Sequence, residues 1–181
     1  MHVYVLRGVP RCGKSTLARV YHAMFDRSEY SNRVRTLSAD SYYTNSKGVY
    51  SYDSDLHADA HRTCFRQFLE LISDPEAAVN GWVVVVDNTN SRLIEAAPYM
   101  TAAGSFGHGA TLVTVLTPME EVLRRNEASG TKKVPEVVIL DMWARINPES
   151  PTFEEPPPWW RTKTLTSEDV GNLLGKFDLR P

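Results

Sequence analysis

The sequence contains only two cysteines, Cys12 and Cys64, among its 181 residues. Two cysteines cannot build the disulfide framework that holds together many small secreted domains, and their scarcity favours a reducing compartment. No signal-peptide pattern precedes the first apolar segment. We therefore expect a cytoplasmic protein, or one that works in the cytoplasm of a host if the chain is viral.

Long apolar runs and an excess of either charge are also absent. No apolar run approaches the roughly 20 residues of a membrane helix, so we expect no membrane span. Lysine and arginine number 20 against 22 aspartates and glutamates, which gives a formal net charge of −2. This balance provides no general attraction to nucleic acid, so any nucleic-acid site must be a local basic patch.

What the sequence does contain is a glycine-rich loop, GVPRCGKST, at residues 8–16. It matches the pattern G-x-x-x-x-G-K-[ST], in which backbone N–H groups surround the phosphates of a nucleotide. An apolar run at residues 2–6 predicts a strand before the loop, and apolar residues at helical spacing predict a helix from about Lys14. The motif therefore has the strand and the helix N-terminus that phosphate binding requires.

Each residue type in this loop predicts a particular contact with ATP and Mg²⁺, the two expected cofactors. Lys14 should bind the β- and γ-phosphates, and the Ser15 hydroxyl should ligate Mg²⁺. Arg11 is a weaker phosphate candidate, and Cys12 should contribute only its backbone. The other expected nucleotide-binding residues are Gly8, Pro10, Gly13 and Thr16.

The rest of the chain alternates between strand and helix patterns. The expected strands cover residues 2–6, 32–37, 82–86 and 110–116. The expected helices follow the phosphate loop, span 57–73 and 91–103, and begin near Pro118 and Pro135. Ser91 and Thr117 should cap the helices that begin at 91 and 118. Four strand–helix repeats with short connections predict an α/β fold, a doubly wound parallel sheet of the phosphate-loop kinase type with a helical lid.

The composition changes near Asn147, where prolines become frequent. We expect residues 1–147 to form the kinase domain and 148–181 to form a Pro-rich C-terminal appendage with one short helix, capped by Thr166. The Trp159-Trp160 pair should pack against the domain, because acidic residues precede it.

Polar residues follow the expected strands at the edge where parallel sheets bind ligands. Asp40 follows the second strand and is our candidate for the base that accepts the proton of an acceptor hydroxyl. Asp87, Asn88 and Thr89 follow the third strand and are candidates for substrate contacts, with Asp87 also placed to hold Mg²⁺ through water. The alternative is that either aspartate only caps the next turn or helix.

A basic turn has the composition of a lid, with Arg124, Arg125, Lys132 and Lys133 around Gly130. An arginine that closes on the phosphates stabilises transition-state charge, whereas the alternative is a solvated basic surface. The polar loop after Asp40 is rich in tyrosine, and its rings either stack on a nucleobase or pin the loop to the domain. These residues are Tyr42, Tyr43, Tyr50 and Tyr52.

Taken together, these residues resemble the polynucleotide 5′-kinase branch of the phosphate-loop kinases, which includes kinase domains of phage and bacterial end-healing enzymes. The resemblance covers about residues 1–146, and a broader relative is the zeta-toxin group, which phosphorylates small nucleotide sugars. The similar stretches are GVPRCGKSTLAR, Ala39-Asp40, Ala60-His61, Val86-Asp87-Asn88-Thr89-Asn90 and RNEASGTKKVP. The last of these is the most specific, because phosphate-loop kinases at large do not share it.

The resemblance implies that Asp40 is the general base and Arg125 a lid arginine, and it gives Lys14 and Ser15 the roles named above. Two positions depart from the family. An arginine that grips the phosphate of the acceptor is usual three residues after the base, where this chain has Tyr43.

The second departure is a lid arginine of the phage enzymes, which is Ser129 in this chain. Lys132 or Lys133 could replace that arginine, whereas nothing in the turn replaces the one at position 43.

The leading hypothesis is an ATP-dependent kinase that transfers the γ-phosphate to a hydroxyl of DNA or RNA, most readily a 5′-OH end, in DNA modification or repair. The loss of an acceptor-phosphate arginine at Tyr43 also suits a hydroxyl on a modified DNA base, or a small nucleoside or metabolite. A third hypothesis is an ATP-binding regulatory module without transfer activity. The complete set of Lys14, Asp40 and Arg125 argues against it.

Overall fold

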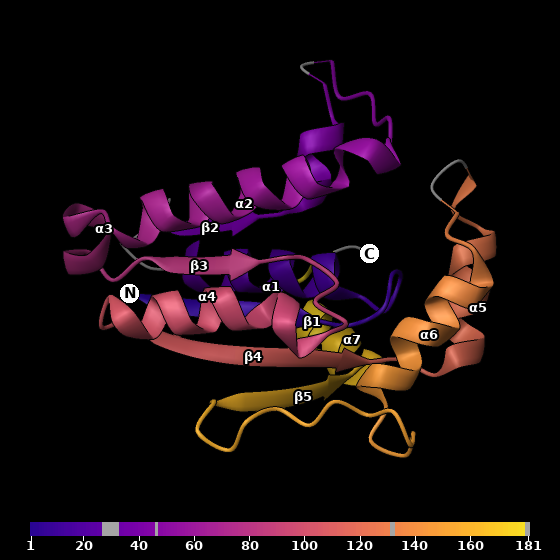
Figure 1. Cartoon of the computed structure of the whole chain (residues 1–181). Coiled ribbons are helices and arrows are strands. Elements are labelled where there is room, and N and C mark those ends of the chain that lie inside the picture. The colour runs from indigo at the N-terminus through magenta and orange to yellow at the C-terminus, as the bar shows by residue number, and fades with distance from the viewer. Residues whose placement is uncertain (27–32, 46, 131–132, 180–181) are drawn as a thin grey trace.

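The computed structural model describes residues 1–26, 33–45, 47–130 and 133–179, and it confirms the α/β fold (Figure 1). All neighbouring strands of the five-stranded sheet run parallel, in the order β2-β3-β1-β4-β5. The strands are β1 His2–Arg7, β2 Val34–Leu37, β3 Val83–Val86, β4 Gly109–Leu116 and β5 Thr162–Thr166. The first strand lies at the centre, so the loop that follows it opens at the middle of the sheet edge.

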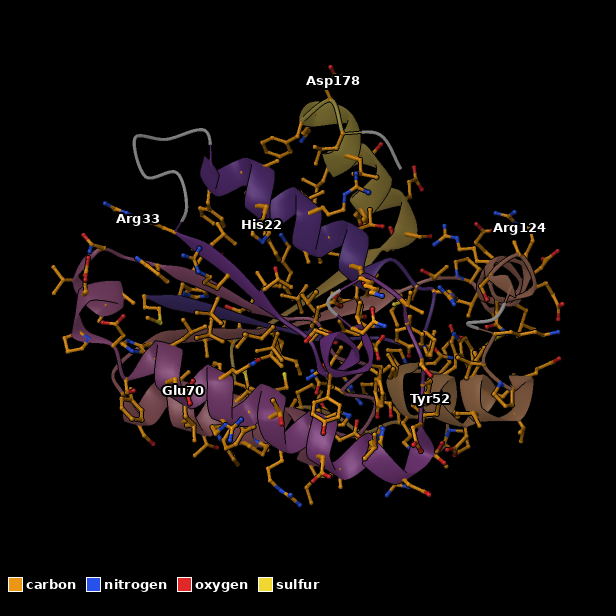
Figure 2. All side chains as sticks on the ribbon, turned by 90° about the horizontal axis from the view of Figure 1, so that it is seen from above. His22, Arg33, Tyr52, Glu70, Arg124 and Asp178 are labelled. Carbon is orange, nitrogen blue, oxygen red and sulfur yellow. The ribbon has the colours of Figure 1, made fainter. Side chains whose placement is uncertain are left out.

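Helices cover both faces of the sheet. In Figure 2, α1 and α7 lie on one side of the strands, and α2 lies on the other side together with α4. The helices are α1 Lys14–Asp26, α2 His57–Ile72, α3 Pro75–Val79, α4 Leu93–Ser105, α5 Met119–Glu127, α6 Glu136–Ile146 and α7 Ser167–Lys176, with the short 3₁₀ turns η1 Ala39–Tyr43 and η2 Ser54–Leu56. None of these described helices is both long and apolar enough to cross a bilayer.

Two hydrophobic layers hold the helices to the sheet. Alternate residues of a strand point to opposite faces, so Val3 and Val5 of β1 belong to the layer under α2 and α4, and Leu6 belongs to the layer under α1 and α7. Every residue of β3 is buried, as the valine-rich run predicted. Phe68 of α2 is fully buried, and a side chain of this kind contributes about 1.5–3 kcal/mol through burial.

Two helix starts differ from the sequence prediction. We expected Ser91 to cap α4, but Ser91 is buried, its carbonyl accepts a hydrogen bond from Arg7, and the helix begins after Arg92. We expected Thr117 to cap the next helix, but its hydroxyl donates to the carbonyl of Cys12 at 2.8 Å. Pro98 lies inside α4 without ending it.

The C-terminal segment contributes more to the sheet than the sequence indicated. Its residues form β5, which pairs with β4 from Leu112↔Thr162 onward, and α7, which packs against α1. Thr166 caps α7 as predicted, in a capping box with Asp169. Of the two tryptophans expected to pack on the domain, Trp160 contacts the layer under α2 and α4, whereas Trp159 is 80% exposed.

Candidate active site

The phosphate loop connects β1 to α1 and turns through two left-handed residues. Gly13 has a φ of 108° and Arg11 a φ of 67°. Glycine adopts this region freely, whereas another residue pays about 1–3 kcal/mol for it. Two hydrogen bonds from outside the loop hold its shape: Arg125 donates to the carbonyl of Arg11 at 3.2 Å, and Thr117 donates to that of Cys12.

Lys14 lies beneath this loop and is only 8% exposed. Its ammonium donates to the carbonyls of Gly8 at 2.9 Å and of Val9 at 2.8 Å. An ammonium has three donors, and the third has only the Cys12 thiol, a weak acceptor, at 3.8 Å. A phosphate oxygen would be a much stronger partner for that third donor, so the side chain is already placed for the contact that the sequence predicted.

Ser15 and Asp87 meet through a side-chain hydrogen bond, although they come from α1 and from the end of β3. Burial raises the pKa of the Asp87 carboxyl above its usual value, while the Ser15 hydrogen bond and the charge of Lys14 act in the opposite direction. A hydroxyl and a carboxylate at the phosphate loop form the oxygen donor set that Mg²⁺ prefers. The residues present therefore fit the metal contact predicted for this pair.

Asp40 lies in η1, directly after β2, and its side chain is exposed. Its negative charge acts on Asp87 and contributes to the raised pKa of that carboxyl, so the two aspartates share the same sheet edge. The cap of η1 is Ser38, whose hydroxyl accepts from the Asp40 N–H at 3.3 Å. Among the described residues, Ser38 and not Asp40 therefore caps this turn, which argues against a purely capping role for Asp40.

Asn88 holds η1 in place from the end of β3. Its side-chain oxygen accepts from the Ala39 N–H at 2.8 Å, and its amide nitrogen lies 3.4 Å from the Tyr99 hydroxyl and 3.6 Å from the Cys64 sulfur. Asn88 was predicted to contact the substrate, but this side chain is 5% exposed and fully engaged inside the protein. Its structural role is to fix the backbone next to Asp40.

Thr89 was also proposed as a substrate contact, and the structure gives it a backbone role. The carbonyl of Thr89 accepts from the N–H of Gly8 at 2.9 Å, which joins the end of β3 to the first residue of the phosphate loop.

Tyr43 is buried, with 6% of its surface exposed, and its contact with the substrate stays a prediction. Its ring centroid lies 5.9 Å from that of Tyr42, 6.0 Å from Tyr50 and 5.0 Å from Tyr52. We call these four residues the tyrosine cluster. Burial, followed by the neighbouring Tyr52 and Asp40, raises the pKa of Tyr43. The rings available to a ligand are those of Tyr42 and Tyr52, which are 42% and 57% exposed.

The predicted lid consists of α5 and α6, which project beyond the carboxyl ends of the strands (Figure 1). Glu121 binds both lid arginines, Arg124 at 2.6 Å and Arg125 at 2.7 Å. Hydrogen bonds from these two arginines lower the pKa of Glu121 to about 2. Such solvent-exposed ion pairs are weak, so a phosphate can replace Glu121 as the partner of either arginine.

The turn between the two lid helices is closed by Asn126, which donates to the Val134 carbonyl at 2.8 Å and accepts from its N–H at 2.9 Å. Of the lysines proposed for this lid, Lys132 lies outside the described residues. Lys133 forms an ion pair with Glu127 at 2.7 Å, and the Ser129 hydroxyl donates to the carbonyl of Asn126.

A cavity of about 500 Å³ adjoins the phosphate loop. Its walls come from the loop, the lid and α7, a helix to which the sequence analysis gave no functional role. The lining residues are Arg11, Cys12, Gly13, Lys14, Ser15, Thr16, Glu121, Arg124, Arg125, Ser167, Val170, Gly171 and Leu174. Figure 2 shows Arg124 and Tyr52 at the same end of the molecule and Arg33 at the opposite end.

Solved structures share this architecture. Kti12 of Chaetomium thermophilum, in complex with ADP-AlF3, is 17% identical over 96% of both chains, with a TM-score of 0.64. A gluconokinase of Sinorhizobium meliloti is 14% identical over 98% of this chain and 91% of that chain, with a TM-score of 0.57. The APS kinase CysC of Mycobacterium tuberculosis, solved with AMPPNP and APS, is 14% identical over 96% of this chain and 97% of that chain, with a TM-score of 0.55. At these identities the likeness concerns the fold.

The family comparison covers most of the chain. The AAA domain matches residues 3–148, a range that includes the phosphate loop, both strand-end aspartates and the lid. The match ends before β5 and α7, so the helix that completes the cavity wall lies outside the matched range. With the phosphate loop, the parallel sheet and the helical lid all in their expected places, this chain belongs to the AAA domain family of phosphate-loop proteins.

Proposed function

We propose that this protein is an ATP-dependent phosphotransferase that passes the γ-phosphate of ATP to an acceptor hydroxyl. The observation that carries the proposal is the convergence, at one sheet edge, of the phosphate loop, the Ser15–Asp87 pair and Asp40. A binding module would need only the first of these. The two carboxylates beside the loop give the site a metal contact and a base, which transfer requires.

In this mechanism the protein mainly positions groups and stabilises charge. The loop N–H groups and Lys14 bind the phosphates, and Arg125 exchanges Glu121 for a phosphate oxygen when ATP enters. Ser15, and Asp87 through water, would hold Mg²⁺, which would neutralise charge on the phosphates. Asp40 accepts the proton of the attacking hydroxyl.

The base of the nucleotide should lie against α7. Val170, Gly171 and Leu174 of α7 line the cavity and offer it an apolar surface, and the lid arginines Arg124 and Arg125 line the same cavity. Gly171 is informative, because a Cβ placed there would meet no atom within 4 Å. The space in front of this exposed helical glycine is therefore open, and it adjoins the cavity.

Substituting Gly171→Leu should fill this space and weaken ATP binding at least about tenfold, or about 1.4 kcal/mol. Gly104→Leu is the matched control, because Gly104 lies inside α4, a Cβ there also meets no atom within 4 Å, and α4 does not line the cavity. Titration with a fluorescent ATP analogue measures both. Equal affinities in the two variants would place the base elsewhere.

For the acceptor, the resemblance of the sequence favours a 5′-OH end of a nucleic acid, which we propose as the first candidate. The exposed rings of Tyr42 and Tyr52 near Asp40 support a nucleoside as the unit that is recognised, because bases stack on aromatic side chains.

The charge around Asp40 favours a second candidate, a free nucleoside or another small uncharged molecule. Residues 39–61 carry four aspartates and only one lysine, Lys47. The next basic residue, Arg62, forms an ion pair with Asp59 at 2.6 Å. Tight binding of a nucleic-acid backbone depends on lysine and arginine contacts to phosphates, and residues 39–61 provide few of them.

Transfer of label from γ-labelled ATP separates the candidates and tests the function. The acceptors are 5′-OH oligonucleotides, hydroxymethylated duplex DNA and free nucleosides, each with Mg²⁺ at two salt concentrations. Label on oligonucleotide ends supports the first candidate, and label on nucleosides that does not change with salt supports the second. ATP binding with no label on any acceptor would contradict a transferase and favour a regulatory module.

A further inference from the structure

Arg11 occupies a backbone conformation that favours glycine. Its φ of 67° is left-handed, and the hydrogen bonds from Arg125 and Thr117 to the carbonyls of residues 11 and 12 keep the loop in that shape. A glycine at this position would adopt the same φ without strain. Strained residues of this kind cluster at functional sites, where the surrounding structure holds them. The backbone at position 11 would favour glycine, so we look to the arginine side chain for the reason that this position is not a glycine.

The Arg11 side chain borders the nucleotide cavity, and its charge also reaches the tyrosine cluster beside Asp40. It lines the cavity together with Lys14 and Arg125. Its positive charge also acts on Tyr50 of the tyrosine cluster, whose pKa is raised by burial and by Asp40 and is lowered by Arg11. The phosphoryl group must pass from the cavity towards Asp40, so a charge that lines the cavity and acts on the tyrosine cluster is a candidate for contact with it.

Arg11 differs from the other basic residues near the cavity in the element that carries it. Glu121 binds Arg124 and Arg125, so one carboxylate charge offsets part of the lid. Lys14 donates to two loop carbonyls, and position 43, where the resembling kinases place an arginine, holds a buried tyrosine. Arg11 differs from the lid arginines because it is carried by the phosphate loop itself, whose position does not depend on closure.

We propose that the guanidinium of Arg11 contacts the phosphoryl group during transfer and is thereby a catalytic residue. This inference rests on the proposed function. The bond between the γ-phosphorus and the β–γ bridging oxygen breaks, its electron pair leaves with ADP, and a bond to the acceptor oxygen forms. The acceptor proton passes to Asp40, while Arg11 stays protonated and donates to the phosphoryl oxygens, on which negative charge is spread.

Arg11→Gly tests this inference with a variant that relieves strain, so it should fold at least as well as the parent protein. We expect kcat to fall at least about 100-fold, as for the loss of one transition-state donor. The thermal midpoint should stay equal or rise. Asp178→Gly is the matched control: Asp178 also has a positive φ, 53°, but is exposed beyond α7, far from Arg124 in Figure 2. It should relieve strain and leave kcat unchanged.

A second readout does not depend on the acceptor. ADP with Mg²⁺ and aluminium fluoride imitates the transferred phosphoryl group, so the parent protein should bind it more tightly than ADP with Mg²⁺ alone. Arg11→Gly should lose this added affinity while its affinity for ADP with Mg²⁺ stays within about twofold. Arg11→Lys should recover part of it, because a lysine restores the charge without the planar fork.

The outcomes separate this inference from the proposed function. If Arg11→Gly keeps both its turnover and the added affinity for ADP with aluminium fluoride, the inference is wrong although the transferase stands. If the parent protein transfers phosphate to no acceptor, the proposed function fails, and the aluminium fluoride comparison still decides whether Arg11 contacts the phosphoryl group. A parent protein that gains no affinity from aluminium fluoride would also overturn the inference.

Discussion

Replacing Asp40 with asparagine should reduce kcat for phosphate transfer by about 100- to 10,000-fold, the range expected for loss of a general base. Asparagine has nearly the same shape and cannot accept the proton of the acceptor hydroxyl. It should leave the fold intact, because Ser38 rather than Asp40 caps η1 and Asn88 holds the Ala39 N–H. ATP affinity should stay within about twofold, since Asp40 does not line the nucleotide cavity.

The control for Asp40→Asn is Asp74→Asn. Asp74 caps α3 through its side-chain oxygen, and asparagine caps a helix about as well as aspartate does, so this variant should keep full activity. Turnover and ATP affinity are measured for both proteins by product labelling and by nucleotide titration. Unchanged turnover in Asp40→Asn would show that Asp40 is not the general base. Loss of ATP binding in the same variant would show a structural defect and not the loss of a base.

The parts of the site that are local in sequence could be predicted from sequence. The strand, loop and helix around residues 8–16 form one continuous segment, so residue types and spacing were enough to place Lys14 and Ser15. The topology rule for parallel sheets then brought Asp40 and Asp87 to the same edge. The pairing of Glu121 with Arg124 and Arg125 could also have been predicted, because the arginines lie three and four positions after Glu121 on one helix.

The parts that depend on packing could not be read in the same way. β5 was missed because Leu165 is its only buried residue, so an edge strand of this composition shows no alternating apolar pattern. The role of α7 in the cavity was missed for the same reason, because β5 determines where α7 lies. Tyr43 has a ring that suits either a core or a ligand, and only its packing in the hydrophobic layer under α2 and α4, with three tyrosines beside it, shows that it is buried.

Asp87→Asn should have opposite effects on the metal site and on the stability of the metal-free protein. The carboxylate is needed for Mg²⁺, so we expect Mg²⁺ to bind about 10- to 100-fold more weakly, the usual effect of losing a group that orients a metal's ligands. The Ser15 hydroxyl can still donate to the side-chain oxygen of asparagine, which keeps the local structure. Mg²⁺ titration of the binding of a fluorescent ADP analogue measures the loss.

In the absence of Mg²⁺, the same substitution should raise the thermal midpoint at neutral pH. Burial raises the pKa of Asp87 in the folded protein above that in the unfolded chain, so the folded state binds the proton more tightly. The contribution of Asp87 to the stability of the metal-free protein should therefore increase as the pH falls through this pKa, so the gain in stability from Asp87→Asn over the parent protein should shrink as the pH falls. Thermal unfolding in EDTA across the acidic range tests the sign.

The control for Asp87→Asn is Glu70→Gln, which removes one negative charge from an exposed position on α2, far from Arg124 in Figure 2. It should change neither the Mg²⁺ titration nor the response of stability to pH. If Asp87→Asn binds Mg²⁺ as tightly as the parent protein, the carboxylate does not hold the metal. Removal of the Asp87 charge should stabilise the metal-free fold, and the same change should weaken Mg²⁺ binding. A higher thermal midpoint together with weaker Mg²⁺ binding would therefore show that Asp87 is placed for the metal at a cost to stability.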